Sequence, residues 1–119
     1  MNSPALRKIF KAAEYRRWES GLQGVAKAAI AARIKNLQHG IKGGCAPVGG
    51  GVSELRFHQS GPGWRVYFHE TSAGLLILLL CGGDKSSQQA DIRKARNVLA
   101  RLKAERTKLR QQNIPTTKK

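Results

Sequence analysis

Side chains that could act on a phosphodiester lie in or beside a middle segment of the chain that carries little net charge. Glu54, Arg56 and Arg65 belong to this segment, and Lys85 directly follows it. A guanidinium matches two phosphate oxygens and a lysine adds a point charge, so such cations suit phosphate recognition. A neighbouring carboxylate could serve as a general base. Because both flanking segments are strongly basic, the two arginines of this nearly neutral segment need an explanation of their own.

Two stretches of alternating polarity predict a hairpin that gathers these side chains on one face. The strands run from Val52 to His58 and from Trp64 to His69, and Ser60-Gly61-Pro62-Gly63 predicts the turn between them. Adjacent strands share faces, so one face is expected to be apolar, with Leu55, Phe57, Trp64, Val66 and Phe68. The other face is expected to carry Glu54, Arg56, His58, Arg65, Tyr67 and His69.

A third strand is expected over Leu75–Leu80, where every residue is apolar, as in a strand buried on both faces inside a sheet. The glycines that follow at positions 82 and 83 can turn the chain and bring Lys85 to the polar face of the hairpin. The same face also fits a solvated surface with weak ion pairs. We find no cysteine and histidine cluster with zinc spacing and no nucleotide-binding glycine motif, so neither a metal nor a cofactor is expected.

Helical periodicity frames this predicted sheet. Residues Ala13–Leu22 and Val25–Leu37 predict two short helices in a hairpin, while Arg7–Lys11 fits either a helix or an edge strand. Residues His39–Gly51 hold six glycines and one proline, which predicts a mobile connector and a candidate binding loop.

A basic helix is expected at the C-terminal end. Ser86 or Ser87 would cap it, and its C-terminal part is too charged to be buried. Its apolar stripe consists of Ile92, Ala95, Leu99, Leu102 and Leu109. The predicted fold is therefore α+β, a small antiparallel β-sheet with an N-terminal helix hairpin and a C-terminal helix, the helices on one face of the sheet and the site on the other. We expect one domain over residues 1–112 and a flexible basic tail over 113–119.

Composition narrows the class of protein. The chain has 119 residues, 22 Lys and Arg against 7 Asp and Glu, a formal charge of +15, and 40% apolar residues. This suits one globular domain with a polyanionic partner, either nucleic acid, an acidic protein or an anionic membrane surface. The apolar runs are too short to cross a bilayer. Without a secretory signal, Cys45 and Cys81 are expected to be reduced, half-buried or buried thiols of a cytoplasmic protein.

Three blocks of this sequence resemble the RelE/ParE toxin superfamily, in its addiction-module killer or HigB-like branch. The blocks are Val52–His58, Gly61–Phe68 and Leu78–Gln88, in order and with matching spacing, and the resemblance covers roughly residues 9–102. It implies an N-terminal strand, which favours a strand for Arg7–Lys11. It also implies a toxin that cleaves mRNA on the ribosome and is neutralised by a cognate antitoxin, which we expect to be of helix-turn-helix type.

An RNase without a metal would use the 2′-hydroxyl of its substrate as the nucleophile. Arg56, Arg65 and Lys85 would then stabilise the charged phosphorane, and Glu54 is the preferred base. The general acid stays open among Lys85, His58 and His69. We expect Arg65→Ala or Lys85→Ala to abolish growth inhibition and to leave the fold intact.

The expected substrate contacts surround these catalytic residues. Tyr67 would stack on a base, and Asp84 would orient Lys85 or an arginine. Ala46 stands where the superfamily often has a lysine, so a basic contact is either absent or moved to Lys42. The full expected set is Lys42, His58, Tyr67, Asp84, Ser86 and Gln88.

Two other functions remain open from the sequence. One is a toxin on the same fold that acts on gyrase by binding and needs no catalytic residues. The other is a nonenzymatic nucleic-acid-binding module, in which Arg101, Lys103 and Arg106 of the last helix would carry the function.

Overall fold

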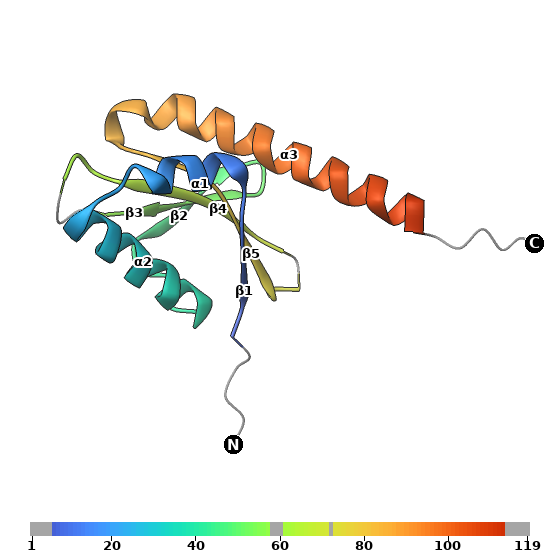
Figure 1. The fold of residues 1–119 in the computed structure, drawn as a ribbon, viewed down its shortest axis with the longest axis horizontal. Coiled ribbons are helices and arrows are strands. Elements are labelled where there is room, and N and C mark those ends of the chain that lie inside the picture. Colours follow the sequence, from blue (N-terminus) through green and yellow to red (C-terminus); the bar gives the residue numbers. More distant parts are fainter. Residues whose placement is uncertain (1–5, 58–60, 72, 114–119) are drawn as a thin grey trace, which may run out of the picture.

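Five strands form one sheet in the computed structural model, which describes residues 6–57, 61–71 and 73–113 (Figure 1). The strands lie in the order β1-β5-β4-β3-β2. They are β1 (Lys8–Lys11), β2 (Cys45–Gly49), β3 (Val52–Arg56), β4 (Arg65–Glu70) and β5 (Leu76–Gly83). All neighbouring strands pair antiparallel except β1 and β5, which are parallel. The predicted α+β class is confirmed, as is the position of the apolar strand inside the sheet.

The N-terminal helix hairpin is also confirmed, as α1 (Ala13–Ser20) and α2 (Gly24–Gln38). The preceding segment is strand β1, as the family resemblance indicates. Its backbone pairs with β5, and the last hydrogen bond of this pairing runs from the Ala12 N–H to the Leu79 carbonyl at 2.9 Å. Gly24 begins α2 with a φ of 58°, a left-handed conformation that suits glycine at the turn between the helices.

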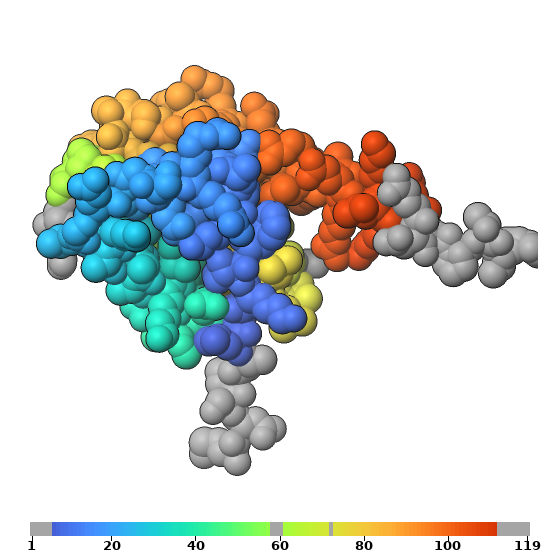
Figure 2. All heavy atoms as spheres, viewed as in Figure 1, coloured from blue at the N-terminus to red at the C-terminus, as the bar shows by residue number. Residues whose placement is uncertain are grey.

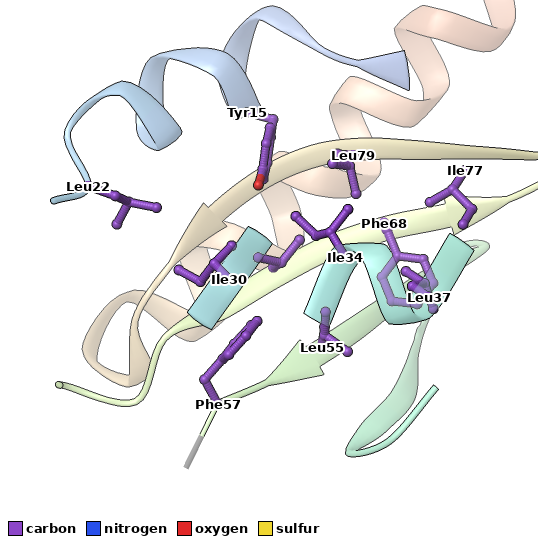
Figure 3. Packing of buried hydrophobic residues seen from close by; sticks show 11 residues of the cluster. Tyr15, Leu22, Ile30, Ile34, Leu37, Leu55, Phe57, Phe68, Ile77 and Leu79 are labelled. Carbon is purple, nitrogen blue, oxygen red and sulfur yellow. The ribbon is translucent and has the colours of Figure 1, made fainter. Parts of the chain in front are cut away.

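The prediction that all helices lie on one face of the sheet is wrong. The α1–α2 hairpin covers one face, where its residues pack in a first core with those of β3, β4 and β5 (Figure 3). The third helix, α3 (Gln88–Asn113), covers the other face in a second core. The second core includes Val52, Tyr67, Leu80 and Cys81 from the strands. An apolar strand such as β5 needs cover on both sides, so the face expected to be open is closed by α3.

The glycine-rich segment is not simply a connector. Residues Cys45–Gly49 form the edge strand β2, which pairs with β3, and Pro47 is tolerated because β2 has a neighbour on one side only. Gly49, Gly50 and Gly51 have φ values of 91°, 65° and 82°, which make the tight turn into β3. The glycines thus serve a hairpin turn, and the mobile-loop interpretation is wrong for this part.

Helix α3 starts differently from the expected pattern. A 3₁₀ turn (Lys85–Ser87) directly precedes it, and this turn is capped by Asp84 and not by Ser86 or Ser87. The C-terminal half extends away from the sheet, with Leu109 57% exposed, which confirms that this part is not buried (Figures 1 and 2). Within the described ranges, every helix is either too short or too polar to span a bilayer.

Candidate functional site

Three cationic residues lie at one corner of the sheet, where β3 and β5 end and β4 begins. Arg56 in β3 is the direct cross-strand partner of Arg65 in β4, and Arg65 is also the partner of Gly83 in β5. The Lys85 N–H donates to the Pro62 carbonyl at 3.4 Å. We call Arg56, Arg65 and Lys85 the cationic corner.

Gly63 shows how close Arg65 and Lys85 come. A methyl group on Gly63 would lie 3.3 Å from the Lys85 Cβ and 3.5 Å from the Arg65 Nη1. The glycine turn therefore packs against both residues, and its lack of a side chain permits this approach.

Glu54 is the buried anion of this corner. Its side chain has no exposed surface and accepts hydrogen bonds from Arg56 Nε at 2.7 Å, Gln88 Nε2 at 2.7 Å and the Tyr67 hydroxyl at 3.1 Å. Arg65 Nε lies 3.8 Å away. Burial by itself would raise the pKa of Glu54, but the hydrogen bonds from Arg56, Gln88 and Tyr67 outweigh it and lower the pKa below its usual range. Glu54 is thus ionised at neutral pH.

This environment differs from what a general base requires. A base must reach the proton that it abstracts and must hold that proton near the working pH. Glu54 is enclosed, its oxygens already accept three hydrogen bonds, and its pKa is lowered. Its position suits a group that holds the neighbouring side chains in place.

The three cations differ in exposure. Arg65 is only 7% exposed; its Nη1 donates to the carbonyls of Gly63 at 3.0 Å and Trp64 at 3.2 Å, and its buried Nε has no hydrogen-bond partner. The Arg56 side chain is 41% exposed, and Lys85 is exposed. Arg56 and Lys85 are therefore the two cations that an external anion can contact directly.

Two expected substrate contacts face Glu54 instead of solvent. Tyr67 is fully buried and donates to Glu54, and burial raises the pKa of its hydroxyl above its usual range. Gln88 is half-buried and also donates to Glu54. The prediction that Tyr67 stacks on a base is wrong for this structure, because α3 covers the face on which the tyrosine lies.

Asp84 and Ser86 build the turn that carries Lys85. The Asp84 Oδ1 accepts from the Ser86 N–H at 2.8 Å and from its hydroxyl at 2.5 Å. The Ser86 side-chain hydrogen bond lowers the pKa of Asp84. Asp84 thus fixes the backbone around Lys85, which agrees with an orienting role.

Other expected residues lie elsewhere. Lys42 Nζ is 3.0 Å from Glu70, at the end of β4 opposite Arg65, so the structure does not bring it to the cationic corner. His69 lies beyond Tyr67 along β4, with Nδ1 2.6 Å from the Gly51 carbonyl oxygen. His58 lies outside the described residues. Of the two described candidates for the general acid, Lys85 lies at the corner and His69 does not.

Comparison with known proteins gives the relatives of this chain. No protein-family model matches it. A Haemophilus influenzae protein, described only as uncharacterized, is 49% identical over 80 residues, which cover 66% of this chain and 79% of that protein. The chain belongs to the same family as this protein.

The fold has a known counterpart among solved structures. A chain of the crystal structure of the toxin–antitoxin complex RelBE2 from Mycobacterium tuberculosis matches with a TM-score of 0.54 and 13% identity. The match covers 68% of this chain and 100% of that chain. At this identity the likeness concerns the fold alone, and it shows that the fold is RelE-like.

Asp91 supports the turn that carries Lys85 and was not predicted from the sequence. Asp91 is 6% exposed and accepts from the Ser87 hydroxyl at 2.5 Å. A methyl group on Gly83 would collide with Asp91, and one on Gly82 would collide with Trp18. The two adjacent glycines were the sequence signal for this packing. They were interpreted as a turn, but they lie in β5 and let the strand pack closely against α3 and α1.

Arg33 of α2 is a second missed residue. In the structure its Nη1 donates to the Arg56 carbonyl at 2.9 Å, and its guanidinium lies 4.9 Å from the centre of the Phe57 ring. It therefore anchors the end of β3, next to the cationic corner.

The two cysteines fit the expectation from the sequence. Both are free thiols; Cys45 is half-buried and Cys81 is buried. Burial raises the pKa of Cys81 to about 12. Within the described ranges, no three His, Cys, Asp or Glu side chains form a group that could hold a metal ion.

The ion pair between α1 and α3 leads to a pH prediction. The side-chain hydrogen bond from Arg101 lowers the pKa of Glu14 to about 2. Because this pKa is lower in the folded than in the unfolded chain, the ionised Glu14 stabilises the fold above about pH 4.5. This contribution to the free energy of unfolding disappears as the pH falls towards about 2. Because the pair is partly exposed, we expect Glu14→Gln to lower the unfolding free energy by at most about 1 kcal/mol at pH 7 and by much less at pH 2.5.

Urea unfolding followed by tryptophan fluorescence at pH 7, 4 and 2.5 measures this effect. The wild-type chain should lose stability more steeply with acid than Glu14→Gln. An equal loss in both proteins would show that Glu14 does not contribute to the pH dependence.

Proposed function

We propose that this chain is the toxin of a toxin–antitoxin pair, of the HigB-like branch of the RelE/ParE superfamily. In this proposal it is an endoribonuclease that cleaves mRNA on the ribosome in the cytoplasm, without a metal. The observation that carries the proposal is the cationic corner, where Arg56 and Arg65 flank one buried carboxylate and the turn that carries Lys85 packs beside them. The RelE-like fold and the formal charge of +15 support it.

The proposed reaction is attack of the 2′-hydroxyl oxygen on the adjacent phosphorus. The bond from phosphorus to the 5′-oxygen breaks, which leaves a 2′,3′-cyclic phosphate and a 5′-hydroxyl. The 2′-hydroxyl gives its proton to solvent, and the departing 5′-oxygen gains one from an acid at the corner. Negative charge develops on the phosphoryl oxygens during this step, and fixed cations directed at that charge usually supply the largest share of the acceleration.

The three cations of the corner differ in their distance from solvent. Arg56 and Lys85, on the solvent side, would contact the phosphate, and Arg65 would add positive charge behind them. Lys85 would also give a proton to the departing oxygen. Glu54 is then a positioning residue. It holds Arg56 through Nε, which leaves the two terminal nitrogens of that guanidinium to bind two phosphate oxygens.

The function is tested by inducing the chain in cells and mapping transcript ends by primer extension. We expect discrete new 5′ ends in mRNA, and cyclic phosphate at the 3′ ends of the upstream fragments. DNA breaks with intact mRNA would instead support a gyrase-directed toxin. Intact DNA and intact mRNA would support a nonenzymatic binding module and would end the nuclease proposal.

The proposed partner is a cognate antitoxin of helix-turn-helix type, encoded beside the toxin. The solved neighbour is part of a toxin–antitoxin complex, and the strong positive charge of this chain favours an acidic partner. Co-purification of the product of the adjacent reading frame with this chain tests the pairing.

A further inference from the structure

A groove lies under the protruding half of α3, away from the cationic corner. Its volume is about 590 Å³, and its lining is mainly apolar. Leu102 and Leu109 of α3 form one side, and Phe10 of β1 with Leu76 and Leu78 of β5 forms the other. Figure 2 shows the hollow between the end of α3 and the chain segments below it. We call this the α3 groove.

Large apolar side chains that line the α3 groove are exposed to solvent. Phe10 is 45% exposed and Leu109 is 57% exposed, although both lie beside other apolar residues. A contiguous exposed apolar patch of this kind is more often an interaction site than part of the ordinary solvent-facing surface. From Leu102 to Leu109 the helix makes two turns, about 10 Å, which matches two or three anchor residues of an apposed helix.

The charges around the groove favour an acidic occupant. Lys103 and Arg106 line it, and within the described part of the chain neither lies within ion-pair distance of a carboxylate. The two acidic residues of the lining already have partners. Glu70 pairs with Arg7 and Lys42, and Glu105 lies 3.9 Å from Arg101. The net field at the rim is therefore positive.

Three other occupants fit less well. RNA would satisfy the basic rim but would leave the leucines and the phenylalanine without apolar contacts. A membrane surface is flat, whereas this surface is concave. A second copy of the chain would bring two molecules of charge +15 together and would place basic rims near each other.

We propose that the α3 groove binds an amphipathic helical segment of the antitoxin, with apolar anchors spaced about three to four residues apart and flanked by Asp or Glu. The inference rests on the proposed toxin function and names the surface and the chemistry of its partner. The anchors would contact Phe10, Leu102 and Leu109, and the acidic flanks would pair with Lys103 and Arg106. The cationic corner lies outside this surface, so antitoxin binding at the groove and RNA contact involve different residues.

The test compares Leu109→Glu with Val25→Glu. Both replace an exposed apolar residue and change the charge equally, but Val25, 75% exposed, lies on α2 outside the groove. The probe is the purified product of the reading frame adjacent to the toxin gene, and affinity is measured by calorimetry. We expect Leu109→Glu to weaken binding about 30-fold or more, as for a central interface anchor, and Val25→Glu to leave it unchanged.

Further variants separate the loss of the apolar anchor from the added charge and from unfolding. Leu109→Gln removes the apolar anchor without adding charge and should also weaken binding, while circular dichroism should show an unchanged helix content. Arg106→Glu should weaken binding and reduce its salt dependence, whereas Lys27→Glu on α2 should change neither by as much. In cells, Leu109→Glu should remain toxic when the antitoxin is co-expressed.

The outcomes separate the two proposals. Absence of binding by the wild-type chain, together with absence of toxicity, would overturn the proposed function. Toxicity with equal antitoxin binding by Leu109→Glu and Val25→Glu would overturn the groove assignment alone. A wild-type dimer that Leu109→Glu dissociates in analytical ultracentrifugation would assign the groove to a second copy and would also overturn it.

Discussion

Glu54→Ala should lower the free energy of unfolding by about 3–5 kcal/mol, the usual cost of removing one partner from a buried ion pair. The substitution leaves the guanidinium of Arg65, only 7% exposed, without its counter-ion. It also removes the acceptor of the Tyr67 hydroxyl and of the Gln88 amide, two groups that are buried or half-buried. Urea unfolding followed by tryptophan fluorescence at pH 7 measures this loss.

Two matched variants show whether the cost comes from the buried charge. Glu54→Gln keeps the volume and one acceptor oxygen, so it should cost less than Glu54→Ala. Glu70→Ala removes a carboxylate from a partly exposed pair with Arg7 and Lys42 and should cost at most about 1 kcal/mol. A loss below about 1 kcal/mol for Glu54→Ala would show that Glu54 does not hold the corner together.

Lys85→Ala should reduce RNA cleavage about 10²- to 10³-fold and abolish growth inhibition, while the unfolding free energy changes by less than about 0.5 kcal/mol. Lys85 is exposed, and its backbone N–H, which the substitution retains, makes the contact with Pro62. The loss of activity would therefore come from the missing ammonium group. Cleavage is measured as cyclic-phosphate product from mRNA on purified ribosomes, at equal protein concentration.

Lys27→Ala is the control for Lys85→Ala, because it removes the same charge from an exposed position on α2. It should retain cleavage and toxicity. Full activity of Lys85→Ala would show that Lys85, the exposed cation on the β5–α3 turn, takes no part in cleavage, and would contradict the proposed site.

Arg65 is less suitable for this comparison than the sequence alone indicates. The expectation that Arg65→Ala leaves the fold intact does not suit a residue that is 7% exposed and donates to the carbonyls of Gly63 and Trp64. Its removal would change the glycine turn and the neighbourhood of Glu54 together. Lost activity in Arg65→Ala would therefore mix catalysis with stability, whereas the contrast between Glu54→Ala and Lys85→Ala separates them.

The sequence predicted the cationic corner because local geometry determines most of it. The period of two fixes which side chains share a strand face, so any register that keeps the apolar residues of both strands on one face places Arg56 and Arg65 together on the other. The end of the apolar strand at Gly82 and Gly83 then places Lys85 close by. Lys42 was misplaced, because its position depends on how β2 pairs and on the long-range partner Glu70.

By itself, the sequence determined the α+β class, the helices, strands β3, β4 and β5, and the shared face of Glu54, Arg56, Arg65 and Tyr67. Only the tertiary structure decided that α3 covers this face, which buries Glu54 and Tyr67 and leaves Arg56 and Lys85 towards solvent. Periodicity along a chain reports which face a residue occupies. It does not report which distant element packs on that face, since that depends on the burial of apolar surface summed over the whole domain.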